Sequence, residues 1–150
     1  MHHPWRELRR LSSWLLTFTH LPPGVRAECH WPKRMILMDR RLTQAERRSV
    51  LAHELEHVER GPFPRWMTPR EEAAVSAAAA RKLIRLHDLG EALAWADHPA
   101  EVAEELWVDI PTVRARLAGL TRDERHYLAR RLAHRHHHHH AEEDHHGAHP

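Results

Sequence analysis

The segment from residue 43 to residue 61 restricts the fold of this chain more than any other part of the sequence. It opens with Thr43-Gln44-Ala45-Glu46, a capping box in which two side chains satisfy free N–H groups at a helix start. Glycine commonly follows the last residue of a helix, and Gly61 provides such an end here. We therefore predict a helix over 43–60. Its apolar residues share one side, which must pack against other parts of the chain: Leu51, Leu55 and Val58.

The same helix contains His53-Glu54-Leu55-Glu56-His57, an H-E-x-x-H pattern whose two histidines lie on its other side. Residues four apart on a helix lie about 40° apart around the axis and roughly 6 Å apart along it, so two imidazoles can bind one zinc ion. Glu54 lies close to the same face, where it can take a proton from a zinc-bound water molecule. The pattern predicts His53 and His57 as zinc ligands and Glu54 as the catalytic base. The alternative is a pair of surface histidines on an ordinary helix.

A third ligand is expected from the next helix, because a catalytic zinc site takes three protein ligands and leaves one position to water. This helix is predicted from residue 68 to about residue 86, and Thr68-Pro69-Arg70-Glu71 gives it a second capping box. Its many alanines allow a close approach to the histidine helix. Because Glu71 is assigned to the cap, we predict Glu72 as the third ligand. The alternatives are Glu71 as the ligand, or two glutamates that only favour the positive end of the helix.

The remaining segments predict an α+β fold, with a small antiparallel sheet and a mainly helical C-terminal part. Residues 4–16 have the apolar spacing of a helix. Three short strand-like pieces follow, separated by proline-containing turns: 16–19, 25–29 and 34–38. Four shorter helices are predicted towards the C-terminus, the last opened by a third capping box that begins at Thr121: 88–96, 99–106, 110–119 and 122–135.

We expect one domain over residues 1–133, with a helical subdomain at about 88–133. Residues 134–150 hold half of the 18 histidines, several acidic residues and no apolar face, so we predict a disordered tail there. Such a tail can bind transition metals loosely. Metal storage, delivery of zinc to the site, no function and an engineered tag are the alternatives for it.

Composition excludes several classes of protein. The chain has no run of about eighteen apolar residues, which a membrane-spanning helix needs, and no apolar signal core near its start. Cys29 is the only cysteine, so no internal disulfide can form. We therefore expect a cytoplasmic protein that does not bind membranes. The formal net charge of +2 does not by itself indicate nucleic acid binding, and no pattern predicts an oligomeric state.

Two segments, 42–57 and 72–76, resemble the ImmA/IrrE family of zinc metallopeptidases, which are gluzincin-like domains of bacteria, mobile elements and phages. The resemblance covers roughly residues 30–120. The Leu-Ala pair before the first histidine and the alanine-rich helix after the third ligand are typical of the family. A later helical element, 107–117, also resembles the usual ending of these domains.

This resemblance implies a zincin-like fold that hydrolyses peptide bonds. It implies His53, His57 and Glu72 as zinc ligands and Glu54 as the general base. Relatives suggest a narrow substrate, a helix-turn-helix transcriptional repressor or a similar regulatory protein that is cleaved to switch genes on. The strand at 34–38 precedes the active helix as the edge strand does in zincins, which implies that an extended substrate can pair with it. The alternative is an ordinary sheet edge that binds no ligand.

The sequence departs from the family pattern at two positions. Glu56 stands where many relatives carry a small or apolar residue, and we expect its carboxylate to face solvent. Ser76 stands four residues after the third ligand, where relatives often carry Asp or Asn. A hydroxyl there can still orient a metal-binding imidazole, although less strongly than a carboxylate.

Other features leave alternatives open. An oxyanion-stabilising donor is expected but not assigned among four candidates: His30, His87, His98 and Tyr127. Residues 100–120 can form a helix-turn-helix or the far wall of the substrate cleft. We favour the wall, and so do not expect nucleic acid as a partner. The alternatives to a peptidase are a non-catalytic zincin-fold regulator that binds a repressor or DNA, and a metal-buffering protein.

Overall fold

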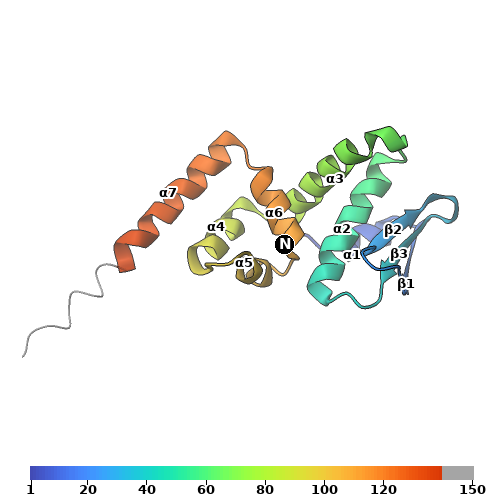
Figure 1. The fold of residues 1–150 in the computed structure, drawn as a ribbon, viewed down its shortest axis with the longest axis horizontal. Helices are drawn as coiled ribbons and strands as arrows, with labels where there is room; N and C mark the ends of the chain where they lie inside the picture. The colour runs from blue at the N-terminus through green and yellow to red at the C-terminus, as the bar shows by residue number, and fades with distance from the viewer. Residues whose placement is uncertain (140–150) are drawn as a thin grey trace, which may run out of the picture.

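The computed structural model describes residues 1–139, and it has a small sheet and a majority of helix (Figure 1). The predicted α+β class and the mainly helical C-terminal part are confirmed. The strands are β1 (Leu15–Thr19), β2 (Ala27–His30) and β3 (Met35–Asp39). The α-helices are α1 (Pro4–Arg10), α2 (Gln44–Arg60), α3 (Thr68–Leu83), α4 (Leu86–Trp95), α5 (Pro99–Glu105), α6 (Ile110–Ala118) and α7 (Arg122–His139). Short 3₁₀ turns, η1 (Trp31–Lys33) and η2 (Arg65–Met67), precede β3 and α3.

Two helix ends differ from the prediction by four residues or more. The first helix ends at Arg10 rather than near residue 16, because the chain turns at Ser12 and Ser13 and then enters β1. Serine side chains compete for backbone hydrogen bonds and so favour turns over helix interiors. The last helix continues to His139, beyond its predicted end at residue 135. The rest of the predicted tail, residues 140–150, lies outside the described residues.

The sheet is mixed, with the strand order β1-β3-β2. Leu16 of β1 lies opposite Ile36 in a parallel pair, whereas Cys29 of β2 lies opposite Ile36 in an antiparallel pair. The prediction of an antiparallel sheet was therefore wrong for β1. A parallel pair needs a long connection, and the β2 strand with its flanking turns supplies one. Apolar alternation identifies a strand but does not determine which neighbour it pairs with.

Helix α2 lies between the sheet and helices α3 to α7 (Figure 1), while α1 packs on its sheet side. Leu51 and Leu55 pack against Ile36 and Met38 of β3, in an apolar cluster that Val58 also joins. Ala52 instead belongs to a second cluster, which is built by helices α3 to α7. The predicted apolar face of α2 is confirmed, and the helix is also buried on a second side.

The three predicted capping boxes have different outcomes. Thr43 caps α2 reciprocally with Glu46, as predicted. Thr121 and Glu124 likewise exchange hydrogen bonds at the start of α7. The prediction of a capping box at Thr68 was wrong. The η2 turn runs directly into α3, and the Thr68 hydroxyl donates to the carbonyl oxygen of Arg65.

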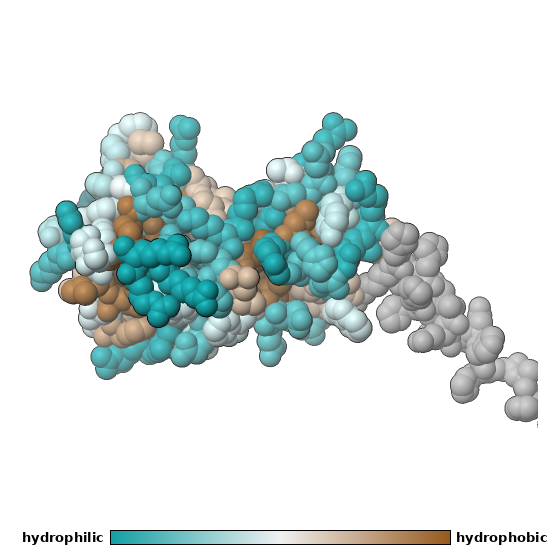
Figure 2. All heavy atoms as spheres, turned by 180° about the vertical axis from the view of Figure 1, so that it is seen from behind, coloured by the Kyte–Doolittle hydropathy of each residue, from teal (hydrophilic) through white to brown (hydrophobic). Residues whose placement is uncertain are grey.

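No helix within residues 1–139 is long and apolar enough to cross a bilayer. Seen from behind, the molecule is largely hydrophilic and its apolar areas are small (Figure 2). Trp66 and Trp95 are the most exposed of its large apolar residues, and they lie on different elements, η2 and α4.

The guanidinium of Arg48 joins α2 to three distant parts of the chain. Its side chain is fully buried. Nη1 donates to the carbonyl oxygen of Trp107 at 2.9 Å, and Nη2 donates to those of His2 at 3.2 Å and Leu83 at 3.4 Å. This one side chain therefore connects the N-terminal segment, the end of α3 and the turn between α5 and α6 to the helix that carries the histidines.

Replacing Arg48 with methionine should lower the free energy of unfolding by at least about 2 kcal/mol, because several buried carbonyl groups lose their donor. Urea unfolding followed by circular dichroism measures this change. Arg114→Met is the matched control, since Arg114 is exposed on α6, and it should change stability by less than about 0.5 kcal/mol. Equal stability of the two variants would contradict the anchoring role.

Candidate metal centre

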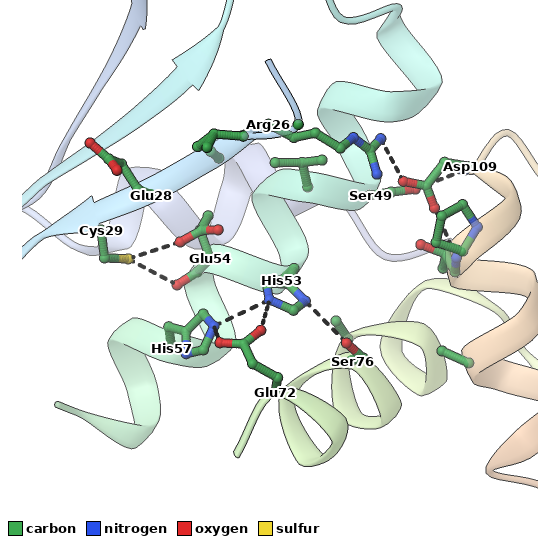
Figure 3. A pocket seen from close by; sticks show the side chains of 18 of the residues that line it. Arg26, Glu28, Cys29, Ser49, His53, Glu54, His57, Glu72, Ser76 and Asp109 are labelled. Atoms are coloured by element: carbon green, nitrogen blue, oxygen red, sulfur yellow. Dashed lines mark hydrogen bonds and ion pairs between the residues drawn. The ribbon is translucent and has the colours of Figure 1, made fainter. Parts of the chain in front are cut away.

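His53, His57 and Glu72 converge on one point between α2 and α3 (Figure 3). The two Nε2 atoms of the histidines lie 3.2 Å apart. One carboxylate oxygen of Glu72 lies 3.1 Å from Nε2 of His53, and the other lies 3.1 Å from Nε2 of His57. Two imidazoles and one carboxylate that face one another in this way can hold a metal ion.

The packing of two helices brings these side chains together. The loop after Gly61 turns the chain back, so α3 runs antiparallel to α2, and the first turns of α3 face the last turns of α2. Small side chains allow the close approach, since Ala52 and Ala79 are both buried in the same cluster. The predicted close approach of the two helices is confirmed, and Glu72 rather than Glu71 lies beside the histidines.

Glu71 has a different partner from the predicted one. Its carboxylate accepts two hydrogen bonds from the Arg60 guanidinium, at 2.8 and 3.0 Å. This pair joins the end of α2 to the start of α3 on the surface. The prediction that Glu71 caps its own helix was wrong, although its assignment away from the metal ligands agrees with this geometry.

Ser76 lies on the outer side of the His53 ring. Its Oγ is 3.5 Å from Nδ1 of His53, at the long limit of a hydrogen bond. Burial, and then the neighbouring His57, lower the pKa of His53. A neutral imidazole is the form that binds a metal ion, so the surroundings of His53 favour its metal-binding form.

Glu54 lines the same cleft without joining the three donor atoms. Its carboxylate is buried between α2 and β2, and Oε2 lies 3.2 Å from the Sγ atom of Cys29. Burial raises the pKa of Glu54 to about 7, with further contributions from the charges of Glu72 and Glu28, while the Cys29 hydrogen bond opposes the rise. A carboxylate with this pKa can both accept and return a proton near neutral pH.

The cleft has a volume of about 750 Å³ and runs from β2 to α6. The first half of α6 lines it with Pro111, Thr112 and Ala115, so the predicted wall is confirmed for α6. Helix α5 contributes no lining residue. Phe63, from the loop after α2, also lines the cleft and stacks on the His57 ring at a centroid distance of 5.8 Å. The four candidate oxyanion donors are not among the lining residues.

Sequence reasoning missed an ion pair that spans the cleft. The Arg26 guanidinium lies 2.8 Å from Oδ2 of Asp109, and both residues line the cleft. Asp109 also caps α6 by accepting from the N–H of Thr112, and its own N–H donates to Oγ of Ser49. An aspartate before Ile-Pro-Thr is a recognisable cap signal, but no local signal indicates Arg26 as its partner.

Glu56 was predicted to face solvent, and this was wrong. Its side chain is buried outside the lining of the cleft and forms an ion pair with Lys82 of α3. Lys82 also lies 3.1 Å from Glu59 and 3.5 Å from Glu7. The long lysine side chain from the neighbouring helix supplies the partner that a buried carboxylate needs.

Comparisons with known proteins identify no relative. No protein-family model matches the sequence, and neither curated proteins nor solved structures give a significant match. We therefore infer a function from the residues that line the cleft and from the donor groups that meet in it.

Replacing Glu72 with alanine should weaken metal binding more than about 100-fold, because a direct ligand matters at least as much as the groups that orient ligands. Glu71→Ala should change the affinity little, since Glu71 pairs with Arg60. Competition for Zn²⁺ against a chromophoric chelator measures both affinities. Equal losses, or a greater loss in Glu71→Ala, would contradict the assignment.

A chain that ends at Ala133 should still retain one tightly bound zinc ion, because the three donors lie within residues 53–72. The measurement is metal content after equilibration with a moderate chelator, in parallel with the full chain. Loss of all tightly bound metal on truncation would place the strong site in the histidine-rich segment instead.

Proposed function

We propose that this chain is a zinc-dependent peptidase that hydrolyses peptide bonds. The observation that carries this proposal is the meeting of the His53, His57 and Glu72 donor atoms with the buried base Glu54 in one open cleft. Its resemblance to the ImmA/IrrE metallopeptidases, with their zincin-like fold, adds to this proposal. We infer the same class of substrate, a transcriptional repressor or similar regulatory protein.

The donor set supports zinc as the metal. Two imidazole nitrogens and one carboxylate suit zinc, whereas calcium and magnesium prefer oxygen ligands throughout. Zinc–nitrogen bonds of about 2.0–2.1 Å give a tetrahedron with edges of about 3.3 Å. The two imidazole nitrogens lie 3.2 Å apart, close to that edge, and each lies 3.1 Å from a different oxygen of Glu72.

When bound, zinc would polarise the scissile carbonyl and acidify water at this site. Glu54 would take a proton from the attacking water, whose oxygen bonds to the carbonyl carbon. As the C–N bond breaks, the same carboxylate would return that proton to the leaving amine. A pKa of about 7 for Glu54 suits both transfers. His53 and His57 would stay neutral as ligands, and Ser76 would orient the His53 ring.

Strand β2 supports a site for an extended peptide. The sequence had suggested residues 34–38 as the edge strand, but β3 occupies the middle of the sheet and β2 is the edge beside the cleft. In the part of the chain that the structure describes, β2 pairs with β3 on one side only. Its other edge can bind a substrate by strand addition, which aligns a backbone carbonyl along the cleft.

Glu54→Gln should retain zinc and its thermal stability, while cleavage of the substrate falls by at least about 100-fold, because the base is lost and the side-chain size is kept. Suitable substrates are casein and any helix-turn-helix repressor encoded beside this gene. Zinc content, melting temperature, cleavage and target-gene induction are measured together.

Glu59→Gln is the matched control on the same helix, since Glu59 is exposed and lies outside the cleft. It should cleave as the parent does. If Glu54→Gln holds zinc and still induces the target gene normally, hydrolysis is not the function. A non-catalytic regulator that acts by binding would then replace the peptidase.

A further inference from the structure

The thiol of Cys29 touches Glu54 across the gap between β2 and α2 (Figure 3). Its Sγ atom lies 3.2 Å from Oε2 and 3.7 Å from the backbone oxygen of Glu54, both within the range for hydrogen bonds from sulfur. Cys29 lies opposite Ile36 in the sheet and packs against the apolar cluster between the sheet and α2. The strand therefore holds the thiol in place.

This thiol is a hydrogen-bond donor rather than a nucleophile. Burial, and then the charge of Glu54, raise the pKa of Cys29 above its ordinary value, so the thiol keeps its proton at neutral pH. An ionised carboxylate can only accept, which fixes the direction of the hydrogen bond from Sγ–H to Oε2. A thiol that stays protonated reacts slowly, and this argues against a reactive role for Cys29.

We infer that Cys29 is a positioning residue for Glu54: it holds Oε2 and leaves Oε1 available to face the metal centre. The catalytic meaning of this inference rests on the proposed peptidase function. The terminal torsion of a glutamate is broad, so a bond to one oxygen restricts the direction of the other. Because β2 is also the proposed substrate-binding strand, Cys29 links the orientation of the base to the strand that holds the peptide.

The contact itself is tested by vibrational spectroscopy. Cys29 is the only cysteine, so a single S–H stretching band reports on it. In the zinc-loaded full chain at alkaline pH, this band should lie at lower wavenumber than in Glu54→Gln, because a carboxylate accepts more strongly than an amide. Glu59→Gln should leave the band where it is in the parent. Coincident bands in the parent and Glu54→Gln would overturn the inference, whatever the activity.

The role in turnover is tested with Cys29→Ala and Cys29→Ser. With casein as the substrate, Cys29→Ala should lose about tenfold in kcat with little change in KM, the loss expected for one hydrogen bond to a charged group. Cys29→Ser keeps a donor and should recover much of that rate. Zinc content and melting temperature are measured alongside, so that a loss of folding is recognised.

The outcomes separate the two proposals. Full activity in Cys29→Ala, or equal slowing of both variants at normal zinc content and stability, would overturn the positioning role. A zinc-loaded parent that cleaves neither casein nor a repressor would contradict the peptidase proposal instead. The S–H band then decides alone whether Cys29 holds Glu54.

Discussion

The buried cation of Arg48 is the interaction on which the rest of the arrangement depends. It binds the carbonyl oxygens of Leu83 and Leu106, at the C-terminal ends of α3 and α5, where the unpaired carbonyl groups of a helix carry partial negative charge. Trp107 adopts a φ of 53°, which costs a non-glycine residue about 1 kcal/mol, and its carbonyl oxygen also accepts from Arg48. Because Arg48 precedes the first histidine by little more than one turn of α2, it also sets the register of the histidines against α3.

Local signals were sufficient for the approximate extents of most helices and for the group of His53, His57 and Glu72 that could hold a metal ion. The capping box at Thr43 and the pattern from His53 to His57 each lie within two helical turns, and the structure keeps both on α2. Glu72 was predictable because a short loop forces two helices to pack antiparallel, and a stretch of alanines lets them approach closely. In each of these cases the deciding residues are near one another in the sequence.

Pairings between distant residues could not be predicted from the same signals. Cys29 and Glu54 are 25 residues apart, and Arg48 and Trp107 are 59 apart. The parallel pairing of β1 depends on the path of the chain between the strands, which apolar alternation does not encode. The capping box at Thr68 failed for a related reason: the preceding 3₁₀ turn supplies the start of α3, and the guanidinium of Arg60 binds the glutamate that would have closed the box.

Two glutamates beside one centre acquire different chemistry from their surroundings. Glu72 remains 43 % exposed and directs one oxygen to each imidazole, so it can join the two imidazoles in holding a metal ion. Glu54 is only 7 % exposed and faces a thiol, so burial raises its pKa to about 7 and leaves it able to exchange a proton. If Glu54 were as exposed as Glu72, it would stay ionised near neutral pH and would be a weaker base. The position of β2 over α2, which buries Glu54 and places Cys29 against it, is therefore as important for the proposed reaction as the three donor atoms.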